Sequence, residues 1–248
     1  MALWPRESFL RWGVVFLGVF LATHWQEVTS PTLNVDDWGL IGDPILQASQ
    51  SRPGWDLVYG FLFQHSYSPF FGWLIAAASL YGLAAVTTMF CPFVTPPWLC
   101  LLALLISSHT YLLDLFNFSF AIGLYLLPAP LSAWGGVLMA YNPGPPLLKR
   151  RWLDGVLGVL LFALAMGIYQ PTGYVGIALP AFHGLARGLG LRRFPAWAVL
   201  RLLAGVFAGG LLYYGWSLAA MQGAAANERS GFADLPRFLE KLTELRVY

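Results

Sequence analysis

Two adjacent acids, Asp36 and Asp37, are the residues best placed to do chemistry in this chain of 248 residues. They precede Trp38 and Gly39 in the first long polar stretch after an apolar N-terminal segment. Two carboxylates held close together repel each other, which raises the proton affinity of one of them. The pair therefore suits a general base that takes a proton from a sugar hydroxyl, and it equally suits a ligand set for a divalent cation. A third interpretation is that the acids only keep the loop in water.

Four further polar residues lie near the ends of apolar segments, where a polar side chain is unusual unless it has a partner or a function. Arg52 either balances charge in an acid-rich loop or binds a phosphate through paired hydrogen bonds. Asp114 lies at the end of an apolar segment, where an acid is costly unless it is paired or faces water. Tyr169 is an ordinary interfacial anchor, but the neighbouring Gln170 needs a hydrogen-bond partner at the membrane edge.

The composition indicates a membrane protein. The chain is 58% hydrophobic and only 10% charged, with a mean hydropathy of +0.62, whereas soluble domains are about 25% charged. The predicted fold class is therefore all-α and polytopic, with membrane lipid as its surroundings. The sequence has no P-loop, no dinucleotide-binding glycine pattern and no basic aromatic face, so nucleic acid is not an expected partner.

Apolar segments of membrane-spanning length predict about seven transmembrane helices. They cover residues 12–22, 69–90, 97–112, 118–140, 152–169, 173–189 and 196–221. Pro128 and Pro130 fall inside the fourth segment, and each removes a backbone hydrogen bond. We expect that helix to bend or break there.

The distribution of charge orients the chain with its N-terminus in the cytoplasm. Nine of the fourteen basic residues then lie inside or just within a span: Arg6, Arg11, Lys149, Arg150, Arg151, Arg187, Arg192, Arg193 and Arg201. Ten of the twelve acids lie outside, all except Glu7 and Asp154. The outer face therefore carries most of the acidic side chains that could take part in chemistry.

Two outer segments accompany the spans in what reads as a single membrane domain over residues 1–248. The outer loop, 24–56, contains the acidic motif. Trp55, Tyr59 and Leu62, with Val58 beside them, repeat at helical spacing, so residues 53–64 are predicted to form a helix in the membrane interface. The outer tail, 223–248, is predicted to form a second, amphipathic helix of the same kind, because apolar and charged residues alternate there at helical spacing.

Several segments together resemble a known family. They are Val35-Asp36-Asp37-Trp38-Gly39, Arg52-Pro53 with Asp56, Ser68-Pro69-Phe70, Tyr111-Leu112-Leu113-Asp114 and Tyr169-Gln170-Pro171. Their order and their place on the outer face resemble the serotype-converting O-antigen glucosyltransferases, the Gtr-type membrane enzymes with a GT-C-like architecture. The resemblance covers roughly residues 36–174.

The resemblance implies an enzyme of the bacterial inner membrane. It would move a sugar, typically glucose, from a polyprenyl-phosphate carrier to a glycan acceptor such as O-antigen on the periplasmic side. By analogy Asp36 or Asp37 would be the catalytic acid, and Arg52 would bind the lipid phosphate. Asp56, Asp114, Tyr169 and Gln170 would line the substrate site. A divalent cation held by the paired acids stays open.

Enzymes of this type are longer than this chain, so the resemblance also implies an N-terminal half, with a missing C-terminal half or a partner subunit. Two alternatives remain. One is a non-enzymatic membrane protein, such as a sugar-lipid translocase or a subunit of a complex, and the other is an inactive truncated member of the family. Neutralising Asp36 and Asp37 separates the enzyme from a scaffold, because only an enzyme would lose turnover.

Overall fold

The computed structural model describes residues 6–29, 52–63, 69–90, 95–108, 121–140, 151–174, 177–178 and 196–221. Within these ranges every regular element is a helix, which confirms the predicted all-α class. The main helices are α1 (Arg6–Thr23), α2 (Trp25–Thr29), α5 (Pro53–Phe63), α6 (Pro69–Phe90), α7 (Pro96–Ser107), α9 (Ile122–Leu126), α10 (Pro128–Ala140), α11 (Arg151–Ile168) and α13 (Ala196–Met221).

Among the described residues, three stretches of helix are long and apolar enough to cross a membrane. They are Phe70–Thr87 in α6, Ile122–Met139 across α9 and α10, and Trp197–Ala220 in α13. Two shorter apolar helices, Pro96–Ser107 and Trp152–Ile168, accompany them. The membrane character of the chain is therefore supported, whereas the count of seven spans stays a prediction. Most of the predicted sixth span, 173–189, lies outside the described residues.

The predicted break at the prolines is present. α9 ends at Leu126 and α10 begins at Pro128, because proline has no N–H to donate to the preceding turn. Leu127 between them nevertheless keeps helical angles, φ −55° and ψ −37°. The two helices therefore continue as one interrupted span.

The third span was predicted over 97–112; α7 ends at Ser107 with Ser108 as its C-cap, and residues 109–112 lie outside the described residues. The hydroxyl of Ser107 donates to the carbonyl oxygen of Leu104 at 2.7 Å, and that of Ser108 donates to Leu105 at 2.9 Å. Serine hydroxyls compete in this way with the backbone hydrogen bonds of a helix. These hydrogen bonds accompany the end of α7 after the apolar residues 101–106.

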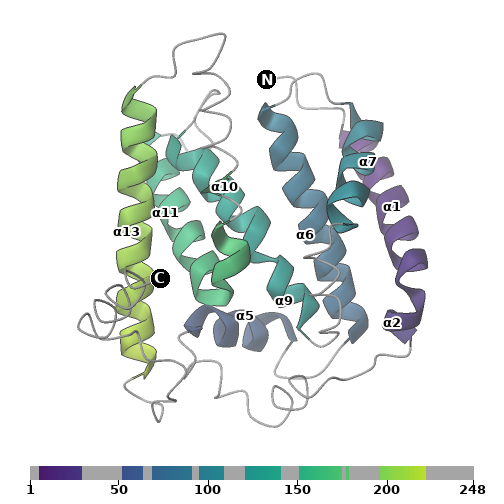
Figure 1. The fold of residues 1–248 in the computed structure, drawn as a ribbon, viewed down its shortest axis with the longest axis horizontal. Coiled ribbons are helices and arrows are strands. Elements are labelled where there is room, and N and C mark those ends of the chain that lie inside the picture. Colours follow the sequence, from purple (N-terminus) through teal and green to yellow (C-terminus); the bar gives the residue numbers. More distant parts are fainter. Residues whose placement is uncertain are drawn as a thin grey trace, which may run out of the picture.

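The helices form two packed groups (Figure 1). In one, α13 and α10 both pack against α11; in the other, α1 and α7 pack with α6. Contacts of α6 with α9 and α10 join the groups. α5 is different, because it lies crosswise at one end of the bundle, against the last turns of α11 and beside α9 (Figure 1).

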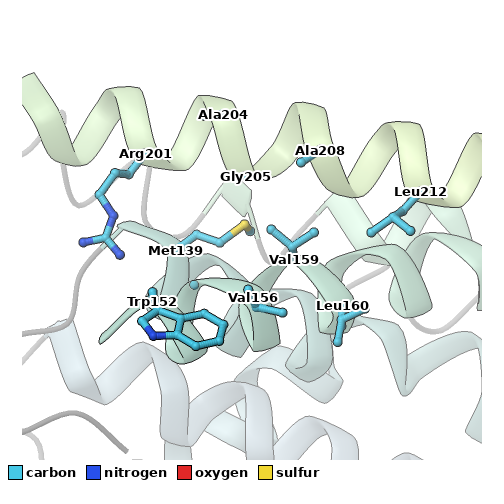
Figure 2. A pocket seen from close by; sticks show the side chains of 11 residues that line it. Met139, Trp152, Val156, Val159, Leu160, Arg201, Ala204, Gly205, Ala208 and Leu212 are labelled. Atoms are coloured by element: carbon cyan, nitrogen blue, oxygen red, sulfur yellow. The ribbon is translucent and has the colours of Figure 1, made fainter. Parts of the chain in front are cut away.

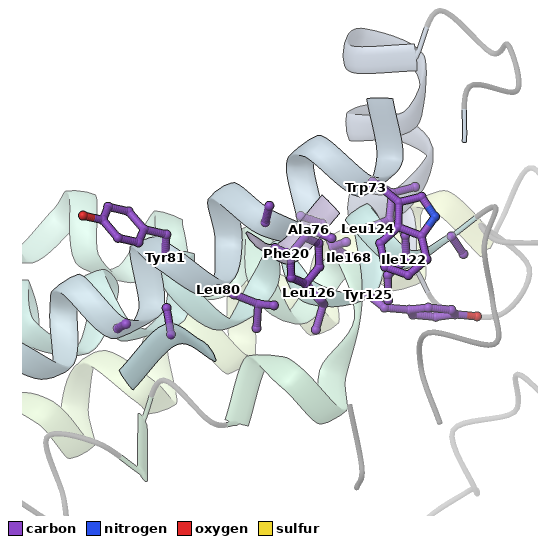
Figure 3. Close-up of a cluster of buried hydrophobic side chains, with 14 of the residues drawn as sticks. Phe20, Trp73, Ala76, Leu80, Tyr81, Ile122, Leu124, Tyr125, Leu126 and Ile168 are labelled. Atoms are coloured by element: carbon purple, nitrogen blue, oxygen red, sulfur yellow. The ribbon is translucent and has the colours of Figure 1, made fainter. Parts of the chain in front are cut away.

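The main buried cluster lies where the two groups meet. Phe20 from α1, Trp73 from α6, Ile122 from α9 and Ile168 from α11 are all 0–1% exposed in it (Figure 3). Lipid is as apolar as these side chains, so close packing rather than escape from water holds spanning helices together. The cluster therefore fixes α9 and the end of α11, which carry the site.

Small residues let α13 approach its neighbours closely. Gly205 and Gly209 are one helical turn apart, and a Cβ added to either would collide with another side chain. At Gly205 the collision is with Met139 of α10, and at Gly209 it is with the ring of Phe162 of α11, 2.6 Å away. This small-xxx-small spacing is typical of helix contacts in membranes.

Candidate functional site

The site is built around the start of α5, which a close glycine contact holds against the end of α11. A Cβ on Gly54 would lie 2.7 Å from the carbonyl carbon of Gly167 and 2.9 Å from the nitrogen of Ile168. No larger residue fits without moving a backbone. The Gly54–Gly167 contact therefore fixes Arg52, two residues earlier, beside the turn that follows α11.

That turn begins with Tyr169, over whose ring the guanidinium of Arg52 lies. The guanidinium carbon is 5.1 Å from the ring centroid, within the range of a cation–π interaction. Arg52 and Tyr169 are both half-buried. The sequence predicted both as site residues without a reason to place them together, and the structure brings them into contact.

A second tyrosine extends this aromatic group. The rings of Tyr125 and Tyr169 have centroids 4.5 Å apart, and Trp55 lies 5.3 Å from Tyr125 on the other side. The hydroxyl of Thr172 donates to the carbonyl oxygen of Tyr125 at 2.6 Å. Since Trp55, Tyr125 and Thr172 are buried, they form the rigid support on which Tyr169 rests.

Gln170 has the hydrogen-bond partner that the sequence demanded. Its side-chain nitrogen donates to the hydroxyl of Tyr213 on α13 at 2.6 Å. Gln170 opens a short helical stretch over 170–174 and is half-buried. The site is therefore connected to α5, α9, α11 and α13 together.

Asp56 lies in the first turn of α5 and is half-buried. An acid there interacts favourably with the positive end of the helix dipole. Asp36, Asp37 and Asp114 lie outside the described residues, as do the predicted interfacial tail 223–248 and most of the loop 24–56.

A helix predicted over residues 53–64 is present as α5, Pro53–Phe63, and its place in the membrane interface stays a prediction. Its predicted stripe is the buried face: Trp55, Val58 and Tyr59 are buried and Leu62 is partly buried. Burial raises the pKa of the Tyr59 phenol, because an apolar environment disfavours the phenolate. Tyr59 is therefore a neutral side chain packed in the main buried cluster.

The described residues provide no cluster of three or more His, Cys, Asp and Glu side chains that could hold a metal. A divalent cation held by Asp36 and Asp37 stays a prediction, because both acids lie outside the described residues. The positive charge at the described part of the site comes from Arg52.

Comparison with known proteins decides the family. The family model described as Glucosyl transferase GtrII matches residues 27–243, which is most of the chain. The chain belongs to the GtrII glucosyl transferase family. Neither the curated proteins nor the solved structures contain a match.

Membership of the GtrII family confirms the Gtr-type resemblance and makes this chain a membrane-associated glycosyltransferase by family. The matched region contains the acidic motif, Asp114 and all the described site residues.

Sequence reasoning missed three members of the site, Tyr125, Thr172 and Tyr213. Tyr125 and Tyr213 stand in apolar helices, where a tyrosine hydroxyl usually seeks a partner. That need was a usable signal for Tyr213, since Gln170 was also expected to require a hydrogen-bond partner. No pattern in the sequence indicates which tyrosine meets which turn.

Proposed function

We propose that this GtrII family member transfers glucose from polyprenyl-phosphate glucose to a cell-surface glycan, such as O-antigen, at the periplasmic face of the bacterial inner membrane. The observation that supports this best is the contact of Arg52 with Tyr169, next to Gln170, at one end of the bundle. A planar guanidinium beside polar groups at the end of apolar helices suits the phosphate of a lipid-borne donor.

The placement of α5 supports access from the membrane. Its outward residues are also apolar: Phe61 is 82% exposed and Leu57 is 56% exposed. Such side chains are tolerated where a helix touches lipid, so α5 is suited to lie in the interface with Arg52 at its start. A polyprenyl chain would then stay in the bilayer while its phosphate reaches Arg52.

In the proposed reaction an acceptor hydroxyl attacks the anomeric carbon of glucose, and Asp36 or Asp37 takes the hydroxyl proton. The new glycosidic bond forms as the bond from the anomeric carbon to the phosphate oxygen breaks. The phosphate leaves on the polyprenyl lipid with the bonding electron pair. Arg52 stabilises the negative charge that grows on that phosphate.

The orientation in this proposal agrees with the arrangement of the helices. Basic residues begin α1 at Arg6 and α11 at Arg151, and Arg201 in α13 approaches Gly155 near the start of α11. These starts lie at the end of the bundle opposite α5 (Figure 1). With the N-terminus inside, Arg52 is on the outer side, as the positive-inside rule requires of the less basic end.

The test is glucose transfer in membranes that contain the full chain. Synthetic polyprenyl-phosphate glucose and the glycan acceptor are supplied, and an Asp36→Asn/Asp37→Asn variant is compared at equal expression. Loss of a general base slows transfer about 10²- to 10⁴-fold. The matched control is Asp43→Asn, which removes a charge from the same loop outside the motif and should keep transfer.

Two outcomes would contradict the proposal. Equal transfer by the wild type and the double variant would remove the acids from the chemistry. No transfer by the wild type, with donor and acceptor both present, would favour the non-catalytic alternatives. A translocase, one of these, would still move polyprenyl-phosphate glucose between the two leaflets.

A further inference from the structure

An apolar groove of about 530 Å³ lies between α11 and α13, with Met139 of α10 at its floor (Figure 2). It runs from Trp152 and Arg201 at one end to Leu160 and Leu212 at the other (Figure 2). At about 1.5 Å per residue, Arg201 to Leu212 spans about 16 Å along α13. That length is close to one leaflet of a hydrocarbon core about 30 Å thick. The groove therefore has the length for a lipid acyl chain.

Arg201 is the one charged residue among those that line this groove in the described part of the chain. It is half-buried at the end of the groove, and its guanidinium carbon lies 5.4 Å from the centroid of the Trp197 ring. Asp154, the acid nearest in sequence to this end of α11, is fully buried and does not line the groove. A cation at the mouth of an apolar channel is complementary to a lipid with an anionic head group.

The sequence that precedes α11 and α13 is basic. Lys149 and Arg150 immediately precede α11, and Arg192 and Arg193 come shortly before α13. Basic residues next to spans attract the anionic lipids of the cytoplasmic leaflet. The length of α11, about 27 Å at 1.5 Å per residue, separates the start of α11 from the glucosyl transfer site.

We infer that the groove binds one anionic glycerophospholipid, with an acyl chain along α11 and α13 and its phosphate paired with Arg201. The lipid would fill the space between the two helices on the face where Gly155 and Ala204 leave no bulky side chain. The inference goes beyond the proposed function and does not depend on it, because the head-group contact at Arg201 lies by the start of α11, at the end of the bundle opposite α5.

Trp152 provides a direct readout, because bromine atoms on an acyl chain quench the fluorescence of an indole that they touch. The full chain in detergent is titrated with brominated phosphatidylglycerol or brominated phosphatidylcholine. The signal of Trp152, one of eleven tryptophans, is the difference from a Trp152→Phe variant. We expect half-quenching at about ten-fold lower concentration of phosphatidylglycerol, the scale of one charge-assisted hydrogen bond.

Two pairs of variants separate the head-group contact from the chain contact. Arg201→Gln should abolish the preference for phosphatidylglycerol, whereas Arg11→Gln, an exposed cation near the start of α1, should keep it. Ala208→Leu fills the groove and should weaken both lipids. Ala219→Leu, exposed on α13 outside the groove, should weaken neither.

Four results would overturn the inference. Equal quenching by the two lipids would show only a general annular lipid, and so would a preference that survives Arg201→Gln. If polyprenyl phosphate displaced the brominated phosphatidylglycerol more strongly than non-brominated phosphatidylglycerol does, the groove would be assigned to the carrier lipid. Disulfide-linked dimers of an Ala208→Cys variant, with Cys91→Ser and Cys100→Ala, would assign it to a second copy.

Discussion

The side-chain amide of Gln170 donates a 2.6 Å hydrogen bond to the hydroxyl of Tyr213, which connects the turn after α11 to the C-terminal half of α13. α13 is also fixed against α11 by the close approach of Gly209 to Phe162. The amide is thus oriented by a helix whose own position is set by packing. Because Tyr169 precedes Gln170 directly, the same contact steadies the ring beneath Arg52.

Tyr213→Phe tests this relationship. The change keeps the ring but removes the hydroxyl that accepts from Gln170. We expect glucose transfer to fall about ten-fold, since the lost hydrogen bond is worth about 1 kcal/mol and the orientation of the amide goes with it. The measurement is the initial rate of transfer from polyprenyl-phosphate glucose.

The double variant distinguishes positioning from a separate effect on folding. If Tyr213 acts through Gln170, then Gln170→Ala and Gln170→Ala/Tyr213→Phe should have equal rates. Additive losses would contradict this coupling. Tyr174→Phe, an exposed tyrosine on the same turn, is the control and should transfer normally.

The contribution of Arg52 to transfer should depend on the planar shape of its guanidinium as well as on its charge. Arg52→Lys keeps the charge but loses the planar fork and most of the contact with Tyr169, so we expect transfer to fall about ten-fold. Arg52→Gln loses the charge as well and should fall about a hundred-fold, mostly through a raised KM for the donor. Steady-state kinetics with varied donor checks both. Equal activity of the lysine variant and the wild type would argue against bidentate binding of phosphate.

Several helices could be predicted from the sequence, because composition marks their ends. Residues 69–90 and 196–221 were predicted as spans and agree with α6 and α13. Each begins at or just after a proline; α6 ends two residues before Pro92, and α13 ends where the apolar run gives way to Gln222. The helix at 53–64 followed from the spacing of its aromatic residues, which proved to be its buried face.

The contacts of the site could not be predicted, because they join residues far apart in the chain. Nothing local to Arg52 indicates Tyr169, and the Gly54–Gly167 approach that unites them appears in the sequence as two unremarked glycines. The end of α7 was missed for a different reason. Hydropathy continues past Ser107, while its hydroxyl hydrogen bond to Leu104 depends on backbone geometry.

Gly54→Ala should disturb the site without touching a polar group. The new methyl would meet the backbone of Gly167 at 2.7 Å, so α5 must move away from α11. Overpacking of this kind costs about 1–3 kcal/mol. We expect a thermal midpoint several degrees lower and slower transfer, measured on a fluorescent fusion in detergent. Gly215→Ala is the control, because a Cβ there meets nothing within 4 Å; it should leave the midpoint unchanged or raised.

The orientation can be tested with single cysteines at exposed positions near the two ends of the first helices. In a chain carrying Cys91→Ser and Cys100→Ala, Thr29→Cys at the end of α2 and Glu7→Cys near the start of α1 are both exposed. Because α1 runs from the basic end of the bundle toward the end with α5, a membrane-impermeant maleimide should label Thr29→Cys in intact spheroplasts. It should label Glu7→Cys only after the membrane is opened. The reverse pattern would put Arg52 and Tyr169 in the cytoplasm, where transfer to a cell-surface glycan has no acceptor, and the proposed function would fail with the topology.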